Sequence, residues 1–506
     1  MGNKKSEAKS RRSKARFVAS KPATNAPWVW HTRAEALGNS PIVFALASLF
    51  LLIPCYWSSR LQAGDLSSHI YNSWLAQLIE SGKTQGLIIA HQTTNVLFDL
   101  LLSSLFKAFG ATVAQRAAVT IAVLIFAWGA FAFTSVVAGR RAWNMLPAIA
   151  ILSYGWVFHM GFFNFYLSLG LCFFALAIAW ERNHKWLTAA ALLLAVAYVA
   201  HGLPVAWTVA LIAYSRLARR LDLRFRAYLL GGALGILFLL RMVLDRLLIT
   251  RWDASQILLI TGADQAYVFD GKYLIISLGL LVVWILFFAA TVQETRLRTL
   301  VSSLPFHFCL LTAAGIFLIP TGVLIPSYDH VLTFIAERMT LALGVCLCAL
   351  FATARPTAFA RYALLALMFL FFGFLYHDHG VLNRLEDRME AAIAQMPVGQ
   401  RVVSGISATN LRVDALNHMI DRVCVARCYS YANYEPSTAQ FRIRAVAQNP
   451  FVVFNYGDSW RLQTGSYIVK PQDIPLYKID VDAAGRMIVV SLMPGEVNGV
   501  SSWNFY

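Results

Sequence analysis

The chain has 506 residues, of which 58% are hydrophobic and 14% are charged. A soluble globular protein is roughly half apolar and about a quarter charged, so this composition excludes an ordinary soluble protein and indicates an integral membrane protein. The mean hydropathy of +0.58 agrees with that class. The formal net charge of +17 is dispersed over a basic tail and several short loops, which excludes one continuous face that could follow the phosphates of a nucleic acid.

The first apolar run covers residues 41–58 and follows a basic tail at residues 1–40. The run lacks a small-residue cleavage site, so we predict a retained signal anchor rather than a removed secretory peptide. Because Lys and Arg stay on the cytoplasmic side of a membrane, the tail predicts a cytoplasmic N-terminus.

The basic loops between the later apolar runs set the predicted topology. RLARRLDLRFR at residues 216–226 carries five arginines, and the loops at 139–143 and 181–186 are also basic, so all three should face the cytoplasm. Because these loops lie on the same side of the membrane, the chain must cross the membrane an even number of times between any two of them. This requires two short spans or a re-entrant pair over residues 187–215, interrupted at HGLP (201–204), instead of one long kinked helix. Eleven crossings leave the C-terminus outside. The predicted spans are residues 41–58, 113–138, 142–158, 165–181, 187–201, 203–215, 227–247, 272–291, 305–325, 338–353 and 361–377.

Residues 378–506 are too polar for the membrane and predict a small extracytoplasmic α/β domain. An amphipathic helix opens it at residues 381–396, where apolar positions recur at three- and four-residue spacing. Strands are expected at residues 401–406 and 451–456, and a hairpin at 476–493. The fold class is therefore a polytopic α-helical membrane protein, with a cytoplasmic tail at 1–40, a multispan domain of about eleven helices at 41–377, and the α/β domain at 378–506.

Two of the seven cysteines, Cys424 and Cys428, lie four residues apart on the predicted outer side. An oxidising compartment permits a disulfide between them. Two unpaired thiols, or a zinc site with His418, stay open as alternatives, although the spacing matches no common zinc pattern. The other cysteines lie in predicted spans, where small polarizable side chains serve packing.

The first predicted outer loop, residues 59–112, is longer than a simple turn needs, and Asp65 stands at its entrance. Amphipathic patterns at 67–81 and 94–110 predict two helices along the outer interface. Asp65 is either an N-cap of the first of these helices or a catalytic base. His69 follows one helical turn later, where it orients the acid, shares a metal or simply lies at the interface.

A cytoplasmic N-terminus, one span, and a long outer loop that opens with an acid and contains interfacial helices together resemble the GT-C glycosyltransferases. These integral membrane enzymes take sugars from polyprenyl-phosphate carriers. The stretches HMGFFNFYLSLGLCFFALAIAWERN and AERMTLALGVCLCAL are also similar to bacterial multispan proteins of this kind. The resemblance covers most of the membrane part and implies that Asp65 is the catalytic base or orients the acceptor. Many members have two adjacent acids at this loop, whereas Leu66 follows Asp65 here, so dependence on a divalent metal stays open.

Arginine is the natural holder of a phosphate because its guanidinium is always charged and can bind in a bidentate manner. Arg338, beside Glu337, lies where the tenth span meets the outer surface, and it either contacts the donor phosphate or anchors the interface. Arg241 lies within a span, four residues before Asp245, which could instead neutralise it. Further supporting contacts to the sugar or the acceptor are predicted from Asp329, His330 and His159.

The leading functional prediction is transfer of a sugar from a polyprenyl-phosphate carrier to a lipid, glycan or protein acceptor. Asp65 would be the base, on the periplasmic face of a bacterial inner membrane. One alternative is a transporter or lipid flippase, which predicts charges near the bilayer midplane and repeated halves. The sequence instead concentrates charge at the outer surface and has no repeat of fixed period. A non-catalytic envelope assembly factor is the other alternative.

Overall fold

The computed structural model describes residues 40–180, 185–326, 330–408 and 410–503. The predicted tail, apart from residue 40, and the candidate Asp329 lie outside the described residues. The chain divides into two compact units, residues 1–47 and residues 48–506. The second unit contains every candidate site residue that is described below.

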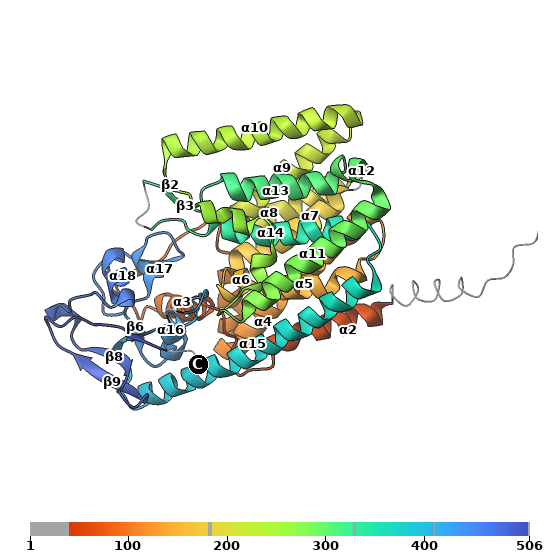
Figure 1. Ribbon diagram of the computed structural model, residues 1–506. Helices are drawn as coiled ribbons and strands as arrows, with labels where there is room; N and C mark the ends of the chain where they lie inside the picture. Colours follow the sequence, from red (N-terminus) through yellow and green to blue (C-terminus); the bar gives the residue numbers. More distant parts are fainter. Residues whose placement is uncertain (1–39, 181–184, 327–329, 409, 504–506) are drawn as a thin grey trace, which may run out of the picture. The chain divides into compact units, whose positions relative to one another are not determined.

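The described residues are mainly helical, and most strands fall in the C-terminal region (Figure 1). The helices are α2 Pro41–Leu52, η1 Ile53–Cys55, α3 Leu66–Glu80, α4 Leu97–Ala138, η2 Trp143–Met145, α5 Leu146–Ser153, α6 Trp156–His159, α7 Phe163–Trp180, α8 Lys185–Ala200, α9 Gly202–Ala218, α10 Leu223–Leu247, η3 Ala254–Leu259, η4 Ala263–Ala266, α11 Tyr273–Thr295, α12 Leu297–Val301, α13 Leu304–Leu318, α14 Ile335–Phe351, α15 Ala358–Ile393, α16 Met419–Cys424, α17 Tyr434–Ser437, α18 Tyr456–Thr464 and η5 Pro471–Asp473. The strands are β1 Leu87–Ile89, β2 Ile249–Arg251, β3 Gly322–Leu324, β4 Arg401–Ser404, β5 Ile406–Ser407, β6 Tyr429–Ser430, β7 Ile443–Ala445, β8 Leu476–Val481, β9 Met487–Leu492 and β10 Ser501–Ser502.

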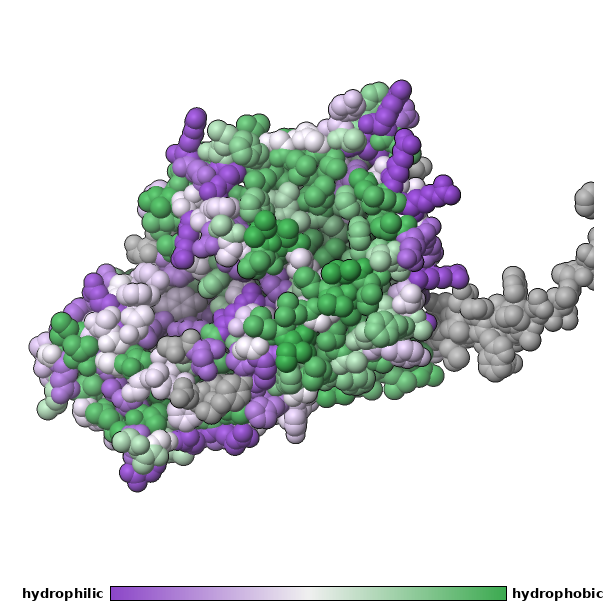
Figure 2. Space-filling model, viewed as in Figure 1, coloured by the Kyte–Doolittle hydropathy of each residue, from purple (hydrophilic) through white to green (hydrophobic). Residues whose placement is uncertain are grey.

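Five described helices, α4, α7, α10, α11 and α15, are long and apolar enough to cross a membrane. Figure 2 shows hydrophobic side chains over much of the helical surface and hydrophilic ones gathered towards its two ends. An outward-facing apolar surface is what lipid contact requires. The other predicted spans form shorter helices, from 8 residues in α5 to 17 in α9 and α14.

The break predicted at HGLP is confirmed. α8 ends at Ala200 and α9 begins at Gly202, while His201 between them is extended, with a φ of −166°. The His201 ring caps the new helix by accepting a hydrogen bond from the backbone N–H of Leu203 at 3.2 Å. Residues 185–218 therefore form two helices rather than one.

The second interfacial helix and the next span are parts of one element. α4 covers 42 residues, but Gly110 within it has a φ of 79° and a ψ of 172°, which is not helical. This kink separates residues 97–109 from 111–138, close to the two predicted helices. α3 likewise occupies the position predicted for the first interfacial helix.

The last predicted span and the amphipathic helix after it also form one continuous helix, α15, which runs through residue 378 without an interrupting proline. Its second half carries Glu386, which is buried. Arg422 of α16 donates two hydrogen bonds to this carboxylate, from Nε at 2.7 Å and Nη2 at 2.6 Å. The bidentate pair fixes α16 on α15.

A four-stranded sheet in the order β6-β4-β8-β9 forms the centre of the C-terminal region. β4 runs parallel to β6 and β8, and the predicted hairpin of β8 and β9 is confirmed. Val403, Leu462, Tyr467, Leu476 and Leu492 belong to its buried core. β1 of the first loop pairs antiparallel with β7, so the first loop is joined to this region by backbone hydrogen bonds.

The strand predicted at residues 451–456 is wrong. The side chain of Asn449 accepts hydrogen bonds from the N–H groups of Phe451 and Val452, which turns the chain away from a ladder. α18 then begins at Tyr456, capped by the side chain of Asn455. Local polar side chains at both ends of the apolar run prevail over its strand propensity.

Candidate active site

Asp65 immediately precedes α3, but its side chain makes no capping hydrogen bond. The backbone at this position is already helical, with a φ of −65° and a ψ of −11°. An N-cap usually has an extended backbone, from which its side chain reaches back to the first turn. Capping therefore does not explain Asp65, and its carboxylate, 23% exposed, is free for other partners.

The backbone around Asp65 is held by the stretch HMGFF. The N–H of Gly64 donates to the carbonyl of His159 at 2.7 Å, and the N–H of Asp65 donates to that of Met160 at 3.1 Å. Gly161 has a φ of +83°, and a Cβ added to it would lie 2.6 Å from the backbone nitrogen of Asp65. Only glycine permits both this conformation and this approach.

The predicted supporting residue His159 is fully buried, and its ring is engaged in hydrogen bonds inside the protein. The indole N–H of Trp57 donates to Nδ1 of His379 at 3.1 Å, so Nε2 of His379 carries its proton. That Nε2 lies 3.0 Å from Nε2 of His159, which must accept, leaving Nδ1 of His159 to donate to the carbonyl of Gly155 at 3.2 Å. Both imidazoles are therefore neutral, and the backbone carbonyl of His159 holds Gly64, the residue before Asp65.

Side chains from other segments of the chain lie within electrostatic reach of the Asp65 carboxylate. Nε2 of His418 lies 3.7 Å from Oδ1 of Asp65. The charge of Asp65 also acts on Arg338 of α14, on His330 in the segment before it, and on Tyr434 of α17. The Tyr434 ring lies between the two histidines, 5.3 Å from His418 and 6.0 Å from His330 between ring centroids. The fold thus brings the predicted Asp65, Arg338 and His330 together.

Arg338 makes no hydrogen bond or ion pair among the described residues. Its guanidinium carbon lies 3.7 Å from the centroid of the Phe162 ring, and its Nε is buried with no hydrogen-bond partner. The predicted neighbour Glu337 is engaged elsewhere, because its carboxylate accepts from the hydroxyl of Thr321. Nδ1 of His330 is buried without a partner as well. An unpaired buried polar group costs about 1–3 kcal/mol, so each one calls for an explanation, of which a role in binding or catalysis is one.

Burial and the neighbouring charges shift the pKa values of His330 and Tyr434. Burial lowers the pKa of His330 below its usual value, and the charge of Arg338 lowers it further, while Asp65 opposes both effects. Burial and the carboxylates of Asp65 and Glu435 raise the pKa of the Tyr434 hydroxyl well above its ordinary value. Tyr434 therefore stays a neutral donor next to Asp65.

His69 is turned away from the metal or acid-orienting role predicted for it. Its Nδ1 lies 2.6 Å from Oδ1 of Asp99 in α4, and Asp99 also accepts a hydrogen bond from Asn164 at 2.7 Å. Burial lowers the pKa of His69, but the Asp99 carboxylate outweighs burial and raises that pKa to about 10. The pair joins α3 to α4 as a buried ion pair.

Arg241 is not part of this group. Its Nε donates to Asp245 at 2.6 Å within α10, and Nη1 donates to the carbonyl of Leu318 at 3.4 Å. The guanidinium also lies over the Trp252 ring. Self-neutralisation along one helix, the alternative to phosphate binding, describes Arg241 in this structure.

The C-terminal region supplies residues whose role sequence reasoning missed. Nδ1 of His418 lies 3.0 Å from Oδ2 of Asp421, whose other oxygen accepts from the hydroxyl of Ser430. Asp414 and His418 precede α16 and Asp421 lies within it, so helical spacing in the sequence does not account for their meeting.

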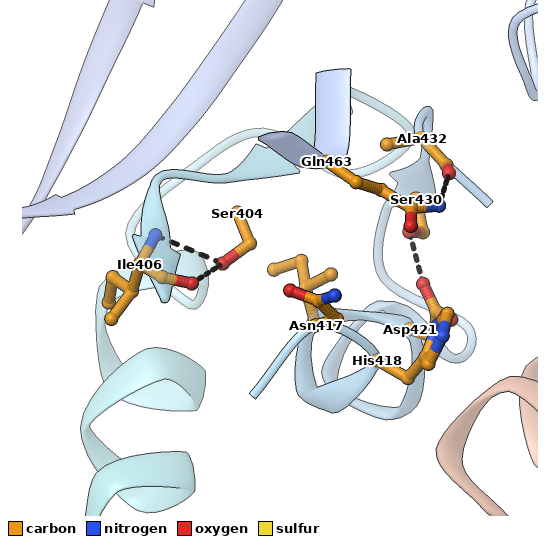
Figure 3. A pocket seen from close by; sticks show the side chains of 9 residues that line it. Ser404, Ile406, Asn417, His418, Asp421, Ser430, Ala432 and Gln463 are labelled. Carbon is orange, nitrogen blue, oxygen red and sulfur yellow. Dashed lines mark hydrogen bonds and ion pairs between the residues drawn. The ribbon is translucent and has the colours of Figure 1, made fainter. Parts of the chain in front are cut away.

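The predicted Cys424–Cys428 disulfide is present, with Cα atoms 4.5 Å apart. It makes the zinc alternative wrong, because neither sulfur is left as a thiolate ligand. Among the described residues, no group of three or more His, Cys, Asp or Glu side chains is placed to hold a metal ion. A small pocket borders His418 and Asp421 and is lined by polar groups of Ser404, Asn417 and Gln463 (Figure 3). Such a lining suits an ordered water beside the pair.

No protein-family model, curated protein or solved structure matches the chain.

Proposed function

We propose that the protein is a membrane glycosyltransferase of the GT-C kind, which moves a sugar from a polyprenyl-phosphate carrier to an acceptor on the outer face of the membrane. One observation carries the proposal: the uncapped carboxylate of Asp65 lies close enough to Arg338 to act on its charge, and the partly buried guanidinium of Arg338 makes no hydrogen bond or ion pair among the described residues. Transfer of a sugar from a lipid phosphate to a hydroxyl requires a base for the hydroxyl and, close to it, a cation that is available to bind the phosphate.

In the proposed reaction, the acceptor hydroxyl oxygen attacks the anomeric carbon of the sugar while Asp65 takes the hydroxyl proton. The bond between that carbon and the phosphate oxygen breaks, and its electron pair leaves with the polyprenyl phosphate. The phosphate thereby gains a second negative charge. Arg338 would stabilise this charge, and Nδ1 of His330 and the hydroxyl of Tyr434 would supply hydrogen bonds to the phosphate or the sugar. Asp65 then releases its proton to water.

The carrier requires a site in contact with lipid. Apolar side chains cover α10, in which none of the 25 residues is buried, and much of α11. We infer eleven crossings, with the N-terminus in the cytoplasm and the C-terminal region in the periplasm of a bacterial inner membrane. This topology would put the Asp65 site on the outer face, where a lipid, glycan or protein acceptor is available. The Cys424–Cys428 disulfide supports an oxidising compartment for that region.

The test compares purified wild-type protein with Asp65→Asn, and with Asp245→Asn as a matched control on an acid outside the site. Each is given polyprenyl-phosphate sugars and a cell-envelope extract as acceptor, and carrier turnover is measured. Turnover by the wild type and by Asp245→Asn, lost in a folded Asp65→Asn, supports the proposal. Equal turnover by all three removes Asp65 as the base. Absence of turnover by the wild type with every donor favours the transporter or the assembly factor.

A further inference from the structure

His418 occupies a place that no local requirement of the C-terminal fold explains. It precedes α16, is only 8% exposed, and lies between two carboxylates from different parts of the chain. Its Nδ1 is 3.0 Å from Asp421 and its Nε2 is 3.7 Å from Asp65. A structural histidine needs one such partner, and the second partner here is the proposed base.

The geometry decides the charge of the ring. Carboxylates only accept hydrogen bonds, so an imidazole that faces one with each nitrogen is most stable when both nitrogens carry protons. Burial lowers the pKa of His418, but Asp421, Asp65 and Asp414 outweigh burial and raise it to about 9. His418 is therefore a cation at neutral pH.

The far side of His418 is rigidly supported. Asp421 is 1% exposed and receives the hydroxyl of Ser430, and the disulfide closes the chain between α16 and that serine. The backbone N–H of Ser430 donates in turn to the hydroxyl of Tyr71 of α3 at 3.0 Å, so the support reaches the helix that Asp65 precedes. A cation held this firmly can orient a neighbouring carboxylate.

We propose that His418, held by Asp421, is a positioning residue that keeps the Asp65 carboxylate aimed at the acceptor. This inference rests on the proposed function, in which Asp65 is the base. It gives the C-terminal region a part in the chemistry, because the cation next to the first-loop acid comes from a segment more than three hundred residues further along the chain. Other titratable groups on which the charge of Asp65 acts are His69, His330, Arg338, Asp414, Tyr434 and Glu435.

The first experiment needs no turnover. Full-length protein labelled with ¹⁵N-histidine is titrated by NMR, and the His418 signals are assigned by their loss in His418→Asn. We expect the wild-type ring to titrate near its raised pKa of about 9. In Asp65→Asn the midpoint should fall by about one to three pH units, because a nearby opposite charge is removed. Asp245→Asn should leave it unchanged. A midpoint that is the same in wild type and Asp65→Asn overturns the proposal.

The second experiment measures kcat and KM of carrier turnover for His418→Asn, His418→Lys and the exposed control His91→Asn. His418→Asn should lower kcat by about 10-fold to 100-fold with little change in KM, as expected of a misdirected base. His418→Lys should restore part of kcat, because it restores the positive charge. Values of kcat and KM for His418→Asn that match those of His91→Asn overturn the proposal. If the wild type turns over no carrier, the proposed function fails and the inference with it, whereas the NMR titration still decides whether Asp65 and His418 share a charge contact.

Discussion

Replacing Gly161 with alanine should disable the site without altering any of its functional side chains. The new Cβ would lie 2.6 Å from the backbone nitrogen of Asp65 and 2.8 Å from that of Leu66, whereas ordinary contacts begin at 3.4 Å. The backbone at Asp65 would therefore have to move by roughly 0.8 Å to restore the 3.4 Å contact. The positive φ of +83° adds a conformational cost for any residue with a side chain.

The magnitudes follow from these two effects. The left-handed backbone costs alanine about 1–2 kcal/mol. The close contact adds about 1–3 kcal/mol of strain, because the colliding atoms are backbone and cannot rotate away. A displacement of a catalytic group approaching 1 Å can cost about 100-fold in rate. Gly161→Ala should therefore lower both the free energy of unfolding and, more severely, carrier turnover.

The matched control is Gly82→Ala. Gly82 follows α3 and has a φ of +69°, but a Cβ added to it meets nothing within 4 Å. It shares the conformational cost of Gly161→Ala without the collision, so it should lose about 1–2 kcal/mol of stability and retain turnover. Unfolding in detergent and turnover are measured for both variants. If Gly161→Ala turns over carrier as fast as Gly82→Ala, the tight approach does not hold Asp65 in place.

Four further outcomes are expected. Arg338→Met should abolish carrier turnover with little change in the midpoint of thermal unfolding, because the guanidinium makes no hydrogen bond or ion pair among the described residues and methionine keeps an apolar contact with the Phe162 ring. A large loss of stability would contradict this. Arg241→Leu should retain turnover within about threefold, since this arginine is paired within its own helix, and a complete loss would return it to the site. Although burial lowers the pKa of His69, the Asp99 carboxylate raises it to about 10, against 6.5 in the unfolded chain, so the stability that His69 contributes is complete below pH 6.5 and is lost as pH rises towards 10. The free energy of unfolding, measured from pH 6 to 10, should therefore fall less steeply with pH in His69→Gln than in the wild type. Replacing Cys424 and Cys428 with alanine should lower the free energy of unfolding by about 2 kcal/mol, as expected for a short closed loop, and reductant should then have no further effect on the variant.

Local patterns determined the secondary structure well wherever one signal dominated. HGLP separates two helices because the residue before α9 is extended and its ring caps the next turn. The hairpin of β8 and β9 follows from alternating apolar residues around AAG. The patterns failed where neighbouring polar groups intervened, as at residues 451–456, and where two predicted helices joined without a helix-breaking residue, as in α15.

At the candidate site, too, the sequence left alternatives open that the structure resolves. The sequence left two roles open for Asp65, because an acid directly before a helix suits both a helix cap and a catalytic base. The tertiary structure shows that Asp65 is not a cap, since its backbone is helical and its side chain makes no capping hydrogen bond. It likewise separates Arg338, which lies within electrostatic reach of the acid, from Arg241, which is neutralised by Asp245.

The sequence by itself determined the class of protein, because hydrophobic content and the length of apolar runs are set by the membrane and need no contact between distant residues. It also determined that an acid opens the first loop and that two nearby cysteines could pair. Only the tertiary structure decided which side chains lie near that acid. His418 and Tyr434 reach it from the C-terminal region through long-range packing, for which sequence periodicity carries no signal.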